Sequence, residues 1–132
     1  MKGVILMDEM SGFGPHLMLD LNDCEPTTLQ DLNLIFDILN DLPGQIGMTK
    51  IAPPYVFKYE GKVPEDLGIT GVVIIAESHL TIHTFQAKNY CFVDMFSCKT
   101  FDYEWAKEFM INAFKSKRPE SHVVFRGKEF PR

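Results

Sequence analysis

The stretch that most constrains the fold is GVVIIAESHLTIHTF, residues 71 to 85, in which two apolar runs flank Glu77-Ser78. Both runs are rich in β-branched residues, a composition typical of β-strands. A third such run, NYCFVDMFSC, follows after a gap of hairpin length. The sequence therefore predicts consecutive antiparallel strands, with a polar dipeptide at the first connection.

Two segments have the periodicity of amphipathic helices. The first opens at residues 26–28, where Thr27 and Gln30 have capping-box spacing, and ends at Pro43-Gly44. The second covers residues 101–115, with Asp102 as its N-cap. The apolar stripes that we expect to face a sheet are Leu29, Leu32, Phe36 and Leu39 in the first helix, and Ala106, Phe109, Met110, Ala113 and Phe114 in the second.

Three further segments have strand composition: HLMLDL, residues 48–59 and SHVVFR. Pro53 and Pro54 interrupt the second of these, which predicts a broken or edge strand. Short links in the middle of the chain favour antiparallel pairing. We expect an α+β two-layer sandwich, a mainly antiparallel sheet with two helices packed on one face, and a single domain over residues 1–132.

Composition excludes several kinds of partner. The formal net charge is -5, and Lys and Arg are scattered, which argues against nucleic acid and anionic membranes. No apolar run is long enough to span a bilayer and no signal peptide is recognisable, so we expect a cytoplasmic chain with a small-molecule substrate. Its three cysteines, Cys24, Cys91 and Cys98, lack metal-ligand spacing, and we expect free thiols and no metal.

The strand register decides where the chemical side chains meet. If Phe85 and Tyr90 flank a four-residue hairpin loop, Cys98 lies opposite Glu77 and beside Ser78. A slip of one residue would turn these side chains to the other face of the sheet. The spacing permits a shared site for the thiol and the serine but does not require it.

Common catalytic arrangements fit Ser78, His83 and Cys98 poorly. A hydrolase nucleophile elbow has glycines two residues on either side of its serine, where this chain has Ala76 and Leu80. His79 and His83 would lie about 13 Å apart in a strand, too far for a shared metal ion. Two interpretations stay open: ordinary strand residues, or a serine whose hydroxyl attacks the carbonyl of the preceding glutamate.

The runs AESHLTIHTF and VDMFSC resemble the signature of the prokaryotic-type S-adenosylmethionine decarboxylase proenzymes. The resemblance extends to GPHLMLDLNDC and GITG and so covers most of the chain. It implies self-cleavage between Glu77 and Ser78 into chains 1–77 and 78–132, with Ser78 converted into a covalent pyruvoyl cofactor. Such a group forms a Schiff base with an amine and withdraws electrons as carbon dioxide leaves.

The resemblance also assigns roles to individual residues. His83 assists processing as proton donor or acceptor, and Thr70 stands where the family usually has a serine that also assists. Cys98 is the general acid that reprotonates the substrate's α-carbon. Phe57 or Phe85 stacks on adenine. The family builds its active site at the interface of a dimer of processed protomers, so a homodimer is implied.

This sequence departs from the family pattern after His83. The family commonly continues with an aromatic residue, a proline and a glutamate that holds the ribose hydroxyls, whereas this chain has Phe85-Gln86-Ala87. We expect decarboxylation of S-adenosylmethionine to the aminopropyl donor for spermidine synthesis. Two alternatives are a pyruvoyl-dependent decarboxylase of arginine or ornithine, motivated by Ala87, and a non-catalytic homologue that binds or regulates a partner.

Overall fold

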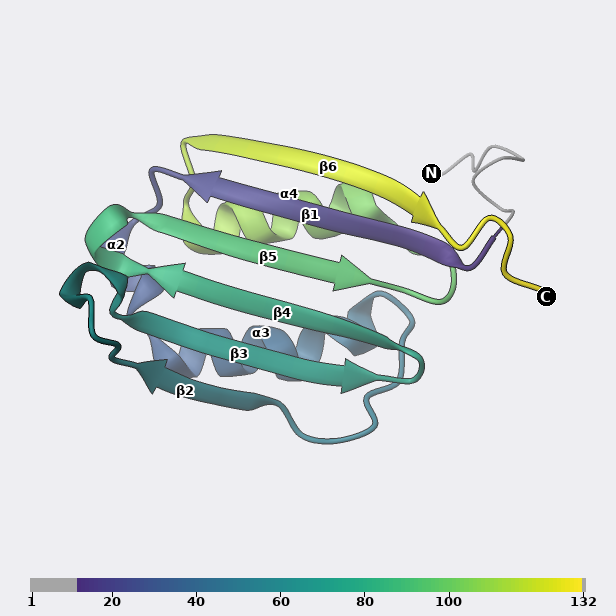
Figure 1. Cartoon of the computed structure of the whole chain (residues 1–132), viewed down its shortest axis with the longest axis horizontal. Helices are drawn as coiled ribbons and strands as arrows, with labels where there is room; N and C mark the ends of the chain where they lie inside the picture. Colours follow the sequence, from purple (N-terminus) through teal and green to yellow (C-terminus); the bar gives the residue numbers. More distant parts are fainter. Residues whose placement is uncertain (1–11, 132) are drawn as a thin grey trace.

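The computed structural model describes residues 12–131, whose strands form one six-stranded antiparallel sheet (Figure 1). In chain order the strands are β1 (Gly14–Asn22), β2 (Tyr55–Tyr59), β3 (Gly68–Ile75), β4 (Ser78–Phe85), β5 (Tyr90–Phe96) and β6 (Arg118–Arg126). Across the sheet they follow the order β2-β3-β4-β5-β1-β6. The stretch around Glu77-Ser78 thus supplies two inner strands, and β2 is an edge strand as predicted.

The register between β4 and β5 is the predicted one. Phe85 pairs with Tyr90 and His79 with Phe96, across a turn that contains a short 3₁₀ helix, η2 (Gln86–Lys88). This pairing directs Leu80 and Ile82 to the same face, where both are buried. The alternation of buried and exposed residues along β4 follows the period of two expected for a strand covered on one side.

The helices α3 (Leu32–Gln45) and α4 (Tyr103–Phe114) cover one face of the sheet, together with the one-turn helix α2 (Pro26–Leu29) (Figure 1). Asp102 caps α4 as predicted, because its carboxylate accepts a hydrogen bond from the Trp105 N–H at 3.0 Å. The α+β two-layer sandwich is confirmed. Within residues 12–131, no helix has the length and apolarity needed to cross a membrane.

The first helix begins at Pro26 as predicted, but its predicted cap and its continuity to Pro43 are wrong. The capping box of Thr27 and Gln30 does not form; instead α2 ends at Leu29, and Asp31 caps a new helix by accepting a hydrogen bond from the Leu34 N–H at 3.0 Å. This break interrupts the predicted stripe, so that Leu32 and Phe36 are partly exposed. The residues of α3 that are buried are Ile35, Ile38, Leu39, Leu42 and Pro43.

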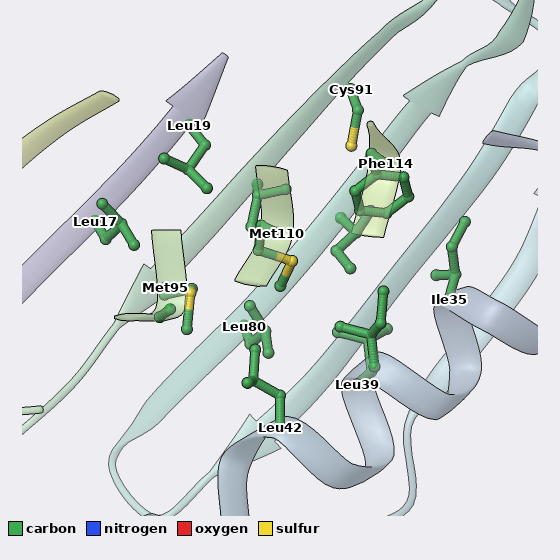
Figure 2. Packing of buried hydrophobic residues seen from close by; sticks show 14 of the residues in the cluster. Leu17, Leu19, Ile35, Leu39, Leu42, Leu80, Cys91, Met95, Met110 and Phe114 are labelled. Atoms are coloured by element: carbon green, nitrogen blue, oxygen red, sulfur yellow. The ribbon is translucent and has the colours of Figure 1, made fainter. Parts of the chain in front are cut away.

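One apolar core fills the space between the sheet and the two long helices (Figure 2). The helices contribute Leu39 and Leu42 from α3 and Met110 and Phe114 from α4, all without measurable exposure. They lie over sheet residues that include Leu17, Leu19, Leu80 and Met95. Burial of one such side chain stabilises a fold by about 1.5 to 3 kcal/mol, so this face holds the sheet's register in place.

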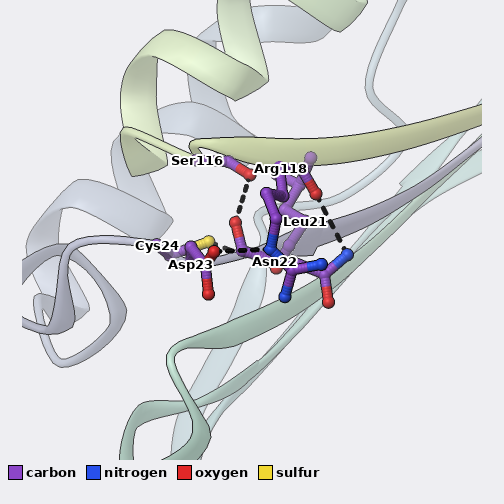
Figure 3. Close-up of polar contacts among 6 residues, drawn as sticks. All are labelled: Leu21, Asn22, Asp23, Cys24, Ser116 and Arg118. Carbon is purple, nitrogen blue, oxygen red and sulfur yellow. Dashed lines mark hydrogen bonds and ion pairs between the residues drawn. The ribbon is translucent and has the colours of Figure 1, made fainter.

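Polar contacts fix the C-terminal end of β1 to α4 and β6 (Figure 3). The Ser116 hydroxyl donates to the Asn22 carbonyl at 2.6 Å, and the Arg118 guanidinium pairs with the Asp23 carboxylate at 2.6 Å. The Cys24 thiol donates to the Leu21 carbonyl at 3.3 Å, and burial raises its pKa to about 11. Cys24 is therefore a structural thiol.

The second face of the sheet, which we call the open face, has none of the described helices over it. Phe57, Thr70, His83 and Phe92 lie in one row across strands β2 to β5, as the cross-strand pairs show. Phe57 and Phe92 are both exposed by 40% or more. A surface that combines exposed aromatic rings with a histidine is typical of an interaction or ligand site.

Replacement of Thr84 by valine should lower the free energy of unfolding by about 2 kcal/mol. The buried Thr84 hydroxyl donates to the Leu29 carbonyl at 2.8 Å and accepts from the Ile69 N–H at 2.9 Å, so valine leaves two buried polar groups unpaired. Urea unfolding measures the change. Thr27→Val, on the exposed surface of α2, is the control and should change stability by less than about 0.5 kcal/mol; equal effects would contradict the prediction.

Candidate active site

The Glu77–Ser78 peptide bond lies in the tight connection between β3 and β4. Ile75 pairs with Ser78, so that Ala76 and Glu77 form the turn. Glu77 has a φ of 64°, in the left-handed region that residues other than glycine adopt at a cost of about 1 to 2 kcal/mol. The bond predicted to break is thus at a strained position, with the Glu77 side chain exposed and the Ser78 side chain buried.

Cys98 lies beside Ser78, as the predicted register requires. The Cys98 backbone N–H donates to the Ser78 hydroxyl oxygen at 2.8 Å, and the Cys98 thiol donates to the Ala76 carbonyl at 3.4 Å. The thiol, the hydroxyl and the turn therefore occupy one corner of the molecule. A backbone donor aimed at the serine oxygen stabilises negative charge that develops there.

The segment that carries Cys98 is held by β1. The Ser97 N–H donates to the Pro15 carbonyl at 3.1 Å, and the buried Ser97 hydroxyl donates to the Lys99 carbonyl at 2.5 Å. A Cβ added at Gly14 would lie 2.0 Å from the Ser97 carbonyl oxygen. The glycine therefore allows the close backbone approach that places Cys98 against Ser78.

His83 and Thr70 form a second group of predicted site residues. Thr70 Oγ1 lies 3.2 Å from His83 Nδ1, across the β3–β4 pair. Both residues line a cavity of about 250 Å³ on the open face, whose lining is Tyr59, Asp66, Gly68, Thr70, His83, Thr84 and Phe85. A histidine hydrogen-bonded to a hydroxyl in a cavity has the arrangement of a proton-transfer group.

One protomer does not bring the two groups together. Ser78 shares the helix-covered face with Leu80 and Ile82, whereas His83 has the opposite parity and lies on the open face. Five residues of extended strand separate Ser78 and His83, about 16 Å at about 3.3 Å per residue. The described chain therefore carries two separate half-sites, Ser78 with Cys98 and Thr70 with His83.

The predicted aromatic residues flank the His83 half-site. Phe85 lines the cavity directly, and Phe57 is the cross-strand neighbour of Thr70. The sequence analysis did not identify Tyr59 and Asp66 as lining residues. No sequence motif indicates that Tyr59 or Asp66 belongs to the site. The segment that carries them comes close to His83 only because β2 pairs with β3 in the folded sheet.

A histidine cluster occupies the open face next to the hairpin. The Asp94 carboxylate accepts a hydrogen bond from His16 Nε2 at 3.2 Å, and its side chain is 41% exposed. The His16 and His79 rings are 6.5 Å apart. Burial, and next the nearby His16, lowers the pKa of His79, which favours a neutral imidazole on the open face.

One group of described residues has ligand atoms close enough for a metal ion. Asp20, Glu120 and His122 place one ligand atom each within 4.8 Å of one another. These side chains are partly or fully exposed, and their strands β1 and β6 do not border the Ser78 hairpin. Exposed carboxylates often lie together on a sheet surface, so this geometry alone assigns no ion.

The fold and the hairpin serine define a class of small two-layer α+β enzymes. The crystal structure of the adenosylmethionine decarboxylase from Aquifex aeolicus matches this fold with a TM-score of 0.75, covering 89% of this chain and 92% of that chain at 24% identity. At this level of identity the match establishes a shared fold.

Sequence comparison identifies the family. The family model described as S-adenosylmethionine decarboxylase matches residues 15–127. The S-adenosylmethionine decarboxylase proenzyme of Thermodesulfovibrio yellowstonii is 38% identical over 119 residues, 89% of this chain and 84% of that protein. The proenzymes of Bacillus cytotoxicus and Pyrococcus furiosus are 33% and 31% identical, covering 92% and 91% of this chain and 89% and 83% of theirs. The chain belongs to the S-adenosylmethionine decarboxylase family.

Gly14→Ala should displace the Cys98 segment and reduce the extent of chain cleavage and turnover at least tenfold, because the added methyl group meets the Ser97 backbone. Gly44→Ala is a matched control in α3, where a Cβ has no neighbour within 4 Å; alanine there should be neutral or stabilise by up to about 1 kcal/mol. Mass spectrometry measures cleavage, and circular dichroism confirms folding. Normal cleavage and turnover in folded Gly14→Ala would contradict the positioning role.

Proposed function

We propose that this protein is a pyruvoyl-dependent S-adenosylmethionine decarboxylase that processes itself between Glu77 and Ser78. The observation that carries the proposal is the hydrogen bond from the Cys98 N–H to the Ser78 hydroxyl, at a strained hairpin turn, in a member of this family. The product would supply the aminopropyl group for spermidine synthesis, and the reaction belongs in the cytoplasm with a small-molecule substrate.

Processing begins when the Ser78 hydroxyl oxygen attacks the carbonyl carbon of Glu77. The peptide C–N bond breaks as the ester C–O bond forms, and the freed nitrogen takes up a proton. Elimination across the Cα–Cβ bond of residue 78 releases chain 1–77 with a terminal carboxylate, and hydrolysis then releases ammonia. Chain 78–132 is left with an N-terminal pyruvoyl group. Strain at Glu77 and the Cys98 N–H both favour the first step.

The residues of the Ser78 corner have a second role in the decarboxylation. A pyruvoyl group at residue 78 would supply an electron sink for decarboxylation of a bound amine. Cys98 would donate the proton to the substrate's α-carbon, since its backbone N–H contacts Ser78 and its thiol contacts the Ala76 carbonyl of the same turn. Cys91 and Cys24 have no such role, because both are buried at the opposite end of β4 from Ser78, where Cys91 pairs with Thr84 and the Cys24 N–H donates to the Asn89 carbonyl.

A complete site requires a second protomer. Ser78 with Cys98 and His83 with Thr70 face opposite sides of one chain, so a partner's His83 and Thr70 would have to approach Ser78. The open face offers exposed apolar side chains for such a contact: Tyr55, Phe57, Ile74, Phe92 and Val124. A homodimer in which the partner's open face meets the β3–β4 turn of this chain would complete two equivalent sites, as isologous contacts do.

S-adenosylmethionine is favoured over arginine and ornithine as the substrate, because the relatives described above are S-adenosylmethionine decarboxylase proenzymes. The rate at which labelled carbon dioxide is released from each of the three carboxyl-labelled substrates shows which one the protein decarboxylates. We expect release from S-adenosylmethionine at least a hundredfold above the other two. Release from arginine or ornithine alone would overturn the substrate assignment and leave the processing proposal standing.

Ser78→Ala should remain one intact chain of 15.1 kDa, because alanine has no hydroxyl to attack the Glu77 carbonyl. Denaturing mass spectrometry distinguishes it from the native protein, which should give fragments 1–77 and 78–132. Ser121→Ala removes a hydroxyl from the exposed part of β6 and should be cleaved normally. Cleavage of Ser78→Ala at the native position would remove the basis for the cofactor.

Coexpression of two variants tests the shared site. Ser78→Ala and His83→Ala should each stay largely uncleaved alone. In a mixed dimer, the intact Ser78 of the His83→Ala chain meets the intact His83 of the Ser78→Ala chain. We expect the His83→Ala chain to be cleaved in about half of its copies when the chains are coexpressed at equal levels. No cleavage in purified mixed dimers would contradict a site shared between protomers.

A further inference from the structure

The cavity beside His83 contains a carboxylate that comes from a different part of the chain. Asp66 ends the 3₁₀ helix η1 (Pro64–Asp66), which lies against η2 immediately after Phe85. The Leu67 carbonyl accepts a hydrogen bond from the Gln86 N–H at 3.4 Å, and Asp66 Oδ1 lies 3.1 Å from Lys88 Nζ. Asp66 therefore occupies the space next to residues 86–88, although it precedes them by about 20 positions.

The chemistry of the cavity suits a nucleoside. Its lining combines the rings of Tyr59 and Phe85 with the carboxylate of Asp66. A planar base can lie on an aromatic ring, and a carboxylate offers two oxygens to the two neighbouring hydroxyls of a ribose. Asp66 is the lining residue with an acidic side chain, and Ala87 on the adjoining turn offers a methyl group instead.

The ion pair with Lys88 indicates which part of the substrate Asp66 binds. S-adenosylmethionine carries a positive sulfonium and a neutral ribose diol. A sulfonium at Asp66 would lie close to the Lys88 ammonium, 3.1 Å from the carboxylate, and would be repelled by it. Neutral hydroxyls meet no such repulsion, and a carboxylate that keeps its charge is a strong acceptor.

We propose that Asp66 accepts hydrogen bonds from the ribose hydroxyls of S-adenosylmethionine and supplies the carboxylate that Ala87 cannot. This inference rests on the proposed function, and it assigns a substrate-binding role to a residue outside the AESHLTIHTF run. Lys88 pairs with Asp66 but does not line the cavity, so it is not itself a substrate contact. Because the ion pair is partly exposed, it contributes little binding energy itself.

The test measures equilibrium binding by calorimetry and turnover in parallel, with S-adenosylmethionine and its 2′-deoxyribose analogue. Asp66→Ala should process normally at Ser78 and weaken binding of S-adenosylmethionine about tenfold to a hundredfold, as expected for loss of a hydrogen bond to a charged group. The native protein should bind the deoxy analogue about tenfold less tightly, whereas Asp66→Ala should scarcely distinguish the two compounds.

Two matched controls separate ribose binding from folding. Glu65→Ala removes the neighbouring carboxylate of η1, which does not line the cavity, and Lys88→Ala breaks the same ion pair but keeps the Asp66 acceptor. Both should bind S-adenosylmethionine within about threefold of the native protein. An Asp66→Ala variant that binds like Glu65→Ala, or discriminates the deoxy analogue like the native protein, overturns the inference. Binding without carbon dioxide release in the native protein would instead refute the proposed function, because the two readouts are separate.

Discussion

The antiparallel register of β4 and β5 is the constraint on which the Ser78 half-site depends. With His79 opposite Phe96, the Cys98 N–H reaches the Ser78 hydroxyl at 2.8 Å. A slip of one residue would expose Leu80 and Ile82 and bury His79 and His83 in their place. Each lost apolar contact costs about 1.5 to 3 kcal/mol, so the hydrophobic core fixes the position of the reactive groups.

The two faces of the sheet carry different parts of the candidate site. The helix-covered face holds the buried core and the Ser78–Cys98 corner. The open face carries His83, Thr70 and the cavity that Asp66 lines. These side chains lie outside the buried core, so substitutions among them are less disruptive to folding than substitutions on the helix-covered face.

The sequence predicts those features that depend on local period and on short turns. The succession of strands along the chain and helix α4 with its Asp102 cap follow from alternation and period, and one hairpin loop sets the register that permits the Ser78–Cys98 contact. In that loop Asn89 adopts a φ of 52°, a conformation that asparagine tolerates better than most residues. The first helix was mispredicted because Asp31 is a stronger cap than Thr27 and restarts the helix six residues later than residue 26.

The remaining features depend on contacts between distant segments, which no local pattern records. Gly14 allows a close backbone approach because β1 lies beside β5 in the sheet. The Gly14 Cα therefore lies against the Ser97 carbonyl, which comes more than 80 residues later in the chain. Asp66 reaches the cavity beside His83 because η1 packs on η2. In both cases the residue type is unremarkable in its own segment, and its importance appears only when the sheet order is known.

Ser78 and His83 both lie in strand β4 and are five positions apart, an odd number. Side chains in a strand alternate between faces, so residues separated by five positions lie on opposite sides of the sheet. Thr70, in contrast, pairs directly with His83 and shares its face. No change of loops or rotamers can bring the Ser78 hydroxyl to the His83 imidazole within one intact β4. If both act on the same bond, the second must come from another chain, and the strand period itself makes association part of the chemistry.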